Sequence, residues 1–542
     1  MVRRIIVIFI AIMMIFSFTA CGKENDGTGY LFRYDLSSDP QNLDPQVAVD
    51  ASSIIVIRNI YIGLFTMSET GTIENALAFD YTISDDGLIY DILVRDDNYW
   101  ANADGKKEQV NVTAKDFEYA FKRIFNPQTS SPYREKFICI KNAEKIINGE
   151  IDYSELGVKA TSDFSLRIEL EYPSADFLSL LTTTPAMPCN SSLFHSTNGK
   201  YGLDPDNTYT NGPFYVKQWE FDPYGKNNHM ILRKNKMFSE EMDISPSSLN
   251  FFIEKKYSDR IADFEKEDID CIITDGSDDF IDDEDYSYTE YKYKTYGIMV
   301  NTDNSYFSQV EAREALSLSI DRGSYKDGLT RGRTSAYAII PPAINILNKS
   351  YRELISDQAK VTYNPSLAKE KWEVFLQNND ILSLTGANII VKEGTKNSDD
   401  LNRITSQWQQ NIGFFCGIEV LPEKEYNRRI EEDEYLLALI DITADNNSPR
   451  DVLSQFVTGD EGNAFGYSND KFDEIFDEAI HSEKLSDSVQ LYSDAESEIL
   501  NDYSFIPAFY ESEYLVYPKE ISGIRYDPFT KELDFIHAKN FD

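Results

Sequence analysis

Strand-like and helix-like segments alternate along this chain of 542 residues, and this alternation is the feature that most limits its fold. Residues 166–172 alternate apolar and charged side chains, which is the period of a half-buried strand. Residues 113–125, 364–376 and 468–480 each begin with a capping residue and continue with apolar side chains at helical spacing. The pattern predicts a mixed α/β protein, and the length predicts three or four domains.

The composition excludes several classes of function. The chain has 92 acidic and 52 basic residues, which gives a formal net charge of -40. Such a surface repels nucleic-acid phosphates and anionic lipid headgroups, so we expect no nucleic acid as a partner of the folded body. Hydrophobic residues make up 42% of the chain, which is enough for packed cores and excludes wholesale disorder.

The N-terminus has the features of an export signal. An arginine pair precedes the apolar run 5–18, which is too short to span a bilayer. Small residues then precede Cys21, an arrangement that resembles the lipobox of bacterial lipoproteins, in which the cysteine is lipidated. This resemblance implies a signal peptide over 1–20, a lipidated tether over 21–28, and attachment to the extracytoplasmic face of the cell membrane. A plain signal peptide and an uncleaved anchor are the alternatives.

No group of residues in the sequence suggests a catalyst or a metal site. The other four cysteines are scattered without a CxxC pair, and their disulfide state stays open. The four histidines have no metal-binding spacing, and the acidic stretch 275–285 lacks the pattern of an EF-hand loop. Phosphate-binding glycine motifs and a GxSxG elbow are absent too. We therefore expect no cofactor, no metal and no enzyme, with a cell-surface hydrolase as the alternative.

Short motifs follow one another in a fixed order along nearly the whole mature chain. They are NLDP at 42–45, RNIY at 58–61, DDGL at 85–88, TAKDF at 113–117, PQTSSPY at 127–133, LGVKA at 156–160, TNGPFYVKQW at 210–219 and PP at 341–342. Each motif alone is weak, but their common order resembles that of the oligopeptide- and dipeptide-binding proteins of ABC importers. These belong to the extracellular solute-binding proteins.

The resemblance implies a two-lobed periplasmic-binding-protein-like fold of type II, with an extra domain in the first lobe. The core domain of lobe I is expected to combine residues 29–61, 175–293 and 513–542. The extra domain is expected at 62–174, and lobe II at 294–512. Two lobes that close over a ligand about a hinge can report its presence to a membrane permease. We therefore expect a monomer that delivers its ligand to the permease of an ABC importer.

The resemblance also implies the residues that bind a peptide. Asp445 corresponds to the carboxylate that holds the α-ammonium group, an interaction that gains most in a dry cleft. Val49–Ala51 and Asp441–Thr443 correspond to segments that pair like strands with the peptide backbone. Tyr133 and Tyr426 correspond to aromatic residues that line the site and contact variable side chains.

Several positions depart from the relatives, so the ligand preference stays open. Ile442 stands where relatives often have tryptophan, Thr443 where some have cysteine, and Leu439 where one has arginine. The leading hypothesis is an oligopeptide receptor. A nickel chelate, an opine, a sugar or a signalling peptide is the alternative ligand, and a structural or adhesive lipoprotein is the alternative outside the binding class. The net charge also predicts that strongly acidic peptides are disfavoured, less so at high salt.

Overall fold

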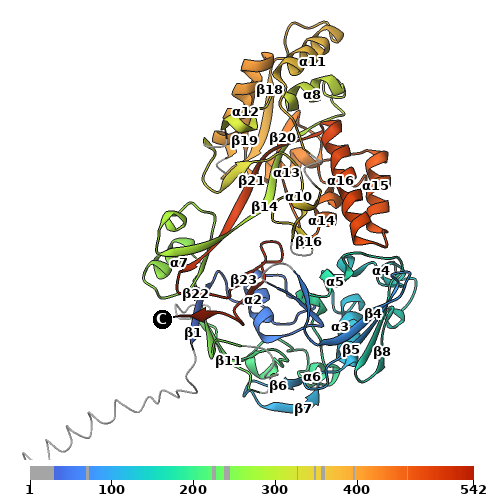
Figure 1. Cartoon of the computed structure of the whole chain (residues 1–542), viewed down its shortest axis with the longest axis vertical. Helices are drawn as coiled ribbons and strands as arrows, with labels where there is room; N and C mark the ends of the chain where they lie inside the picture. The colour runs from blue at the N-terminus through green and yellow to red at the C-terminus, as the bar shows by residue number, and fades with distance from the viewer. Residues whose placement is uncertain are drawn as a thin grey trace, which may run out of the picture.

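The protein forms two lobes, one above the other in Figure 1. The structure is a computed structural model that describes residues 30–68, 72–222, 228–236, 238, 244–254, 256–325, 328–346, 349–355, 360–394, 397–460 and 462–541. The expected signal peptide, the lipidation site Cys21 and the tether lie outside the described residues. The mixed α/β character predicted from the sequence is confirmed.

The lower lobe is built on a four-stranded sheet whose strands come from distant parts of the chain. Its order is β1 (Leu31–Leu36), β12 (Ser248–Ile253), β11 (His229–Lys234) and β10 (Phe214–Glu220), with β1 and β12 parallel. Helix α2 (Ala51–Ile60) contacts β10 and the C-terminal strand β24 (Leu533–Asp534). Asn59 fixes this contact, since its side chain donates to the Leu533 carbonyl at 2.9 Å and accepts from the Phe535 amide at 3.0 Å.

A second four-stranded sheet stands beside the first in the lower lobe. Its order is β4 (Ala78–Ile83), β5 (Ile89–Val94), β9 (Ser165–Glu169) and β8 (Val158–Ser162), with α3 (Ala114–Phe125) packed against β8 and β9. Helix α3 begins at the predicted capping box of Thr113 and Asp116 and buries Phe117, Phe121 and Phe125. This sheet lies within the stretch expected to form the extra domain, whose boundaries stay a prediction.

The upper lobe is built on a seven-stranded sheet. Its order is β13 (Ile272–Thr274), β21 (Phe505–Pro518), β14 (Tyr286–Val300), β20 (Leu437–Thr443), β18 (Ala387–Lys392) and β19 (Cys416–Leu421), and β15 (Arg333–Ser335) also pairs with β21. The helices of this lobe include α8 (Val310–Leu318), α11 (Pro365–Asn378), α12 (Asn397–Ile412), α13 (Glu423–Glu431), α15 (Asp470–Ile480) and α16 (Leu485–Asp502). As predicted, Asn364 caps α11, and the predicted helix after Ser468 is α15, which Asn469 caps.

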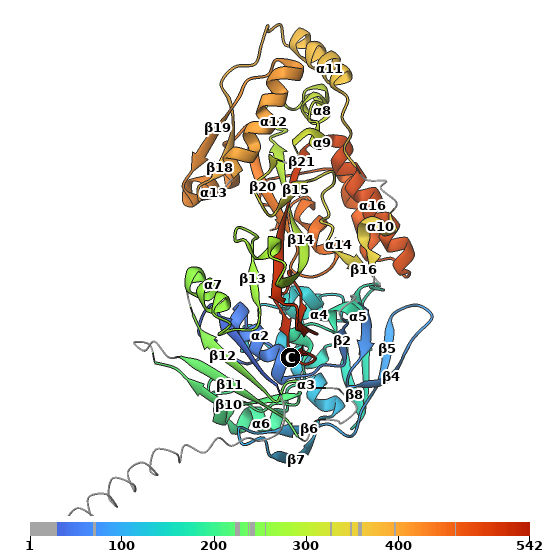
Figure 2. The same ribbon diagram turned by 60° about the vertical axis from the view of Figure 1, so that its left-hand side comes forward.

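Two long strands, β14 and β21, connect the lobes. They pair in antiparallel fashion from Tyr286 opposite Pro518 to Met299 opposite Phe505, and Figures 1 and 2 show them running from the lower lobe into the upper one. The register shifts between Lys292 and Lys294 and again between Tyr296 and Gly297. The lobes also touch at a second place, where the rings of Tyr172 and His481 lie 4.4 Å apart.

The remaining features that the sequence singled out have structural roles. Cys139, Cys189, Cys271 and Cys416 are free thiols, and burial raises the pKa of Cys139 and Cys189 to about 12. In the acidic stretch, Asp279 and Asp282 form ion pairs with Arg331 at 3.0 and 2.5 Å. No group of histidine, cysteine and acidic residues in the described chain is arranged to hold a metal ion. Within the same residues, none of the helices is long and apolar enough to cross a membrane.

Candidate functional site

The upper lobe presents an open strand edge to the space between the lobes. On one side, β20 pairs with β14 over its whole length, from Leu437 to Thr443. On the other side, β18 pairs only with Leu437 and Ala438, so no strand of the described chain pairs there with residues 439–443. Such an edge can accept an extended chain through backbone hydrogen bonds that do not depend on its side chains.

Two of the predicted site residues, Asp441 and Thr443, lie on this edge. The Asp441 carboxylate is exposed and lies 3.4 Å from the Lys294 ammonium group. The Thr443 carbonyl accepts a hydrogen bond of 2.7 Å from Gln455. Both residues therefore border the open edge, and Lys294 is a neighbouring cation that the sequence did not suggest.

Asp445 lies in the loop that follows β20. Its side chain is exposed, and no described residue forms a hydrogen bond or an ion pair with its carboxylate. The next residues fix the loop to both lobes: Asn447 accepts from the Asn345 amide at 2.8 Å, and the Ser448 hydroxyl donates to Asp176 of the lower lobe at 3.1 Å. The fold thus holds a free carboxylate at the end of the open edge, beside the lower lobe.

The lower lobe places Val49–Ala51 at the N-terminus of α2. Val49 is 65% exposed, whereas Ala51 is already the first residue of the helix. Asp50 has extended backbone angles and caps the helix, since its side chain accepts from the Ser53 amide at 2.9 Å. The structure therefore differs from the expected strand-like segment, because the helix begins inside it.

Buried side chains hold the segment that leads to Val49. The Arg123 guanidinium donates to Asp44 at 2.5 Å and to Gln46 at 2.7 Å, and both members of the ion pair are only 6% exposed. The Ser131 hydroxyl donates to the Gln46 carbonyl at 2.6 Å, and the Tyr133 hydroxyl donates to the Ala48 carbonyl. These contacts bring the PQTSSPY motif against the NLDP motif.

The two predicted aromatic residues have different surroundings. Tyr133 is half-buried in the lower lobe, where burial and the charges of Glu532 and Asp50 raise its pKa to about 12. Tyr426 lies on α13 within the core of the upper lobe, and its hydroxyl donates to the Leu439 carbonyl at 2.6 Å. Tyr133 thus supports the lower side of the site, and Tyr426 bonds to the strand with the open edge.

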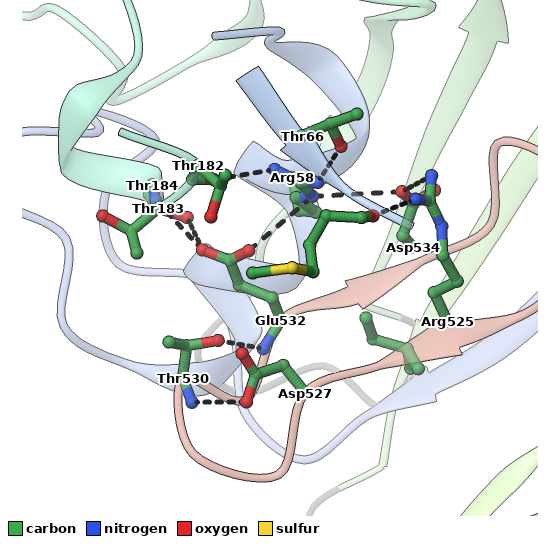
Figure 3. A network of polar contacts seen from close by, with 12 residues as sticks. Arg58, Thr66, Thr182, Thr183, Thr184, Arg525, Asp527, Thr530, Glu532 and Asp534 are labelled. Carbon is green, nitrogen blue, oxygen red and sulfur yellow. Dashed lines mark hydrogen bonds and ion pairs between the residues drawn. The ribbon is translucent and has the colours of Figure 1, made fainter. Parts of the chain in front are cut away.

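A C-terminal hairpin made of β23 (Arg525–Tyr526) and β24 (Leu533–Asp534) contacts α2 and residues 182–184 through a polar network (Figure 3). Arg58 of α2 lies 3.7 Å from Glu532 and 3.9 Å from Asp534. Glu532 accepts from the backbone amide and the hydroxyl of Thr184 at 3.0 and 2.6 Å. Sequence reasoning did not identify this network, although Arg58 belongs to the RNIY motif.

Carboxylates of both lobes lie around Lys136 of the lower lobe. Sequence reasoning did not identify this residue. Burial lowers the pKa of its ammonium group, and this effect is opposed by Asp451, Glu532, Asp527 and Asp445, in decreasing order. Asp445 comes from the loop after β20, Asp451 from the short helix α14 (Pro449–Leu453) that follows it, and Asp527 and Glu532 from the C-terminal hairpin. The only sequence signal was the position of Lys136, three residues after Tyr133.

Two hollows lie beside the predicted site residues. A small one of about 20 Å³ lies between the lobes and is lined by Asp176, Thr183 and Asp527 of the lower lobe and by Asn446–Ser448 of the upper lobe. A larger one of about 400 Å³, here called the hinge cavity, is lined by residues of α2, of β1 and of the crossing strands β14 and β21. Ala51 belongs to its lining, so the hinge cavity adjoins the predicted site.

Comparison with known proteins agrees with this architecture. The chain is 24% identical to the oligopeptide-binding protein OppA of Bacillus subtilis over 541 residues, covering 95% of this chain and 94% of the relative. Its structure resembles the murein tripeptide-binding protein MppA in its unliganded open form, with a TM-score of 0.78, 21% identity and coverage of 95% and 98%. It also resembles Listeria monocytogenes OppA bound to peptide, with a TM-score of 0.66, 23% identity and coverage of 95% and 100%.

These likenesses confirm the two-lobed periplasmic-binding-protein fold of type II that the motif series implied. The model of the bacterial extracellular solute-binding proteins, family 5 (Middle), matches residues 72–464, well over half of the chain. The chain therefore belongs to the family 5 extracellular solute-binding proteins of bacteria.

Proposed function

We propose that this protein is a receptor that binds an extended oligopeptide between its two lobes and delivers it to the permease of an ABC importer. The observation that carries the proposal is the open edge of β20, which ends beside the exposed carboxylate of Asp445, a group without a hydrogen bond or an ion pair to any described residue. A peptide needs both features, because its backbone can pair with a strand edge and its α-ammonium group requires a counter-ion. The relatives named for oligopeptide binding support this ligand class.

The mechanism follows from the position of the site between the lobes. In the open protein, water solvates the Asp445 carboxylate, so the free site carries little electrostatic penalty. Closure of the lobes over a bound peptide removes this water, and the charge-assisted hydrogen bond to the α-ammonium group becomes stronger. The ligand therefore favours the closed form, which we propose the permease recognises. The role is one of binding and release, without catalysis.

We propose further that the receptor acts as a monomer held to the membrane by lipid on Cys21. The support for this anchor is the signal-like sequence before Cys21 and the extracellular assignment of the family. Mass spectrometry of the membrane fraction tests the anchor, because maturation of such a lipoprotein adds lipid to the cysteine and cleaves off residues 1–20. A chain that keeps residues 1–20 or carries no lipid contradicts it.

Calorimetry with a free and an N-acetylated peptide tests the binding function. The protein is first unfolded and refolded to remove carried ligand, and is then titrated with a mixed peptide library and with single members. We expect the Asp445→Asn variant to lose on the order of 2–5 kcal/mol of affinity for the free peptide, the usual loss for removing one partner of a buried charge pair. N-acetylation should weaken binding to the wild type by a similar amount and should have little effect on the variant.

The control is Glu370→Gln on α11, a helix far from the lower lobe in Figures 1 and 2. This change also removes an exposed carboxylate of the upper lobe and should leave affinity unchanged. If no library member binds, the ligand belongs to another chemical class. If free and acetylated peptides bind equally well, Asp445 is not the site of the α-ammonium group.

A further inference from the structure

The hinge cavity contains a buried carboxyl group that is only partly satisfied. Asp35 of β1 is 3% exposed and lines this cavity of about 400 Å³. Its Oδ2 atom has no hydrogen-bond partner in the described chain. Because buried polar atoms are nearly always bonded, this carboxyl group keeps unused capacity to accept a hydrogen bond.

The charges around the cavity indicate the sign of this partner. The charged residues in its lining are four acids, Asp35, Asp275, Glu511 and Glu513, and two bases, Arg260 and Lys531. Two of the acids already have counter-ions, since Glu513 lies 2.9 Å from Lys531 and Glu511 lies 2.9 Å from Arg333. The cavity lining thus contains two more acidic than basic residues.

The charged groups on the elements around Asp35 also favour a cation as the partner of its carboxylate. The pKa of Asp35 is raised to about 7, first by burial and then by the carboxylates of Asp263 on α7 (Tyr257–Glu265) and Glu254 after β12 and by a hydrogen bond with Asp263, while Arg260 on α7 opposes them. The Arg260 guanidinium is itself engaged, because it donates to the Glu254 carbonyl at 3.0 Å and lies over the Tyr257 ring. The local field at Asp35 therefore favours a positive charge.

The cavity also lies where a ligand in the cleft can reach it. Ala51 lines it from the lower side of the predicted site, and Tyr293 and Glu511 line it from the crossing strands. The hollow near Asp445 has a different lining, so Asp35 and Asp445 lie at separate hollows.

We propose that the hinge cavity is a subsite for a cationic side chain of the ligand, an ammonium or guanidinium group, with Asp35 as its counter-ion. This inference rests on the proposed function and deepens it by naming a ligand preference. The α-ammonium group is assigned to Asp445, so the second cation belongs to a later residue of the same peptide.

The test compares lysine with norleucine, which has a similar stem without the charge. Pentapeptides with a free N-terminus carry one or the other at each position after the first, and their affinities are measured by calorimetry. At one position, lysine should bind wild-type protein at least about tenfold more tightly than norleucine. Asp35→Asn should remove this difference between the two peptides. The control Glu254→Gln changes a neighbouring carboxylate outside the cavity lining and should preserve the lysine preference.

A second measurement on the wild type keeps the test valid if Asp35→Asn does not fold. Near pH 7, a cation beside Asp35 stabilises its ionised form, so binding the lysine peptide should release a proton to the buffer. Titrations in two buffers of different ionisation enthalpy detect this proton, and the norleucine peptide should release fewer. Equal proton release by the two peptides would overturn the inference.

The outcomes separate this inference from the proposed function. If peptides of neither series bind the wild type, the proposed function fails. If norleucine peptides bind and lysine gives no advantage at any position, the peptide receptor stands and the cationic subsite is wrong. The subsite is also wrong if the lysine preference survives in Asp35→Asn.

Discussion

The two sides of the region between the lobes are held by different kinds of bonds. Segment 44–48 of the lower lobe depends on side chains from elsewhere in the chain, namely Arg123, Ser131 and Tyr133. Strand β20 of the upper lobe depends on continuous backbone pairing with β14. Single substitutions can therefore displace the lower side, whereas the upper side resists them because many backbone bonds share its support.

Removal of Arg123 should have the largest effect. Arg123→Met leaves Asp44 buried without its counter-ion, and the loss of one partner of a buried pair costs about 3–5 kcal/mol of unfolding free energy. Urea denaturation measures this loss. The control is Lys141→Met, which breaks a solvated pair with Glu169 whose members are 50% and 36% exposed and should cost less than about 1 kcal/mol. Equal losses in the two variants would contradict the contrast between the two sides.

Asp35→Asn should change how stability depends on pH. The pKa of Asp35 is raised from 3.8 to about 7, so between these values the folded protein holds a proton that the unfolded chain has lost. Stability is therefore lost as pH rises through this window, by at most on the order of 4 kcal/mol. Denaturation curves should show the variant to be more stable than the wild type near pH 8, with the difference shrinking near pH 4. A constant difference would show that titration of Asp35 does not cause it.

Two tyrosine substitutions give a matched comparison of the two sides. Tyr133→Phe and Tyr426→Phe each remove one hydroxyl from a backbone carbonyl, that of Ala48 or of Leu439. Each should lower the unfolding free energy by about 0.5–1.5 kcal/mol, the usual net value of such a bond. Only Tyr133→Phe should also weaken peptide binding measurably, because Ala48 has no strand partner to keep it in place. Similar affinity losses in both variants would mean that the upper side is no better supported than the lower.

The contact between Tyr172 and His481 should have the smallest effect on stability. His481→Ala removes the ring contact between the lobes and should cost less than about 1 kcal/mol, since the histidine side chain is 38% exposed. Its main expected consequence is a wider distribution of lobe positions. Small-angle scattering of the ligand-free protein should show a larger radius of gyration for the variant. An unchanged scattering curve would mean that the crossing strands and the Ser448–Asp176 contact hold the lobe positions without the ring contact.

Features of the fold that depend on local sequence were predictable. Thr113 and Asp116 form the expected capping box, and Asn364 and Asn469 cap the expected helices. These motifs act within a few residues, so their meaning does not depend on the rest of the chain. The fold class and the family were predicted from the order of the motif series. That prediction rested on resemblance to known proteins and not on local sequence patterns.

Features that depend on distant contacts could not be predicted. The inner side chains of β1 are Phe32 and Leu36, and their alternation places Asp35 on the other face, where a charged residue is normally solvated. Its burial and its raised pKa come from groups far along the chain, among them Asp263 of α7. The open edge of β20 also has no local signal, because it results from where the parallel strand β18 stops pairing. The ligand roles of Asp445, Tyr133 and the other proposed site residues stay predictions.

The two register shifts in the ribbon of β14 and β21 have a mechanical consequence. Each shift interrupts the ladder of backbone bonds, and both fall within residues 292–297 of β14. Because a bulge bends a strand, we expect rotation of the lobes to concentrate near the first shift, before the continuous pairing of β14 with β20 begins at Lys294. A rotation there moves the far end of the upper lobe further than its near end.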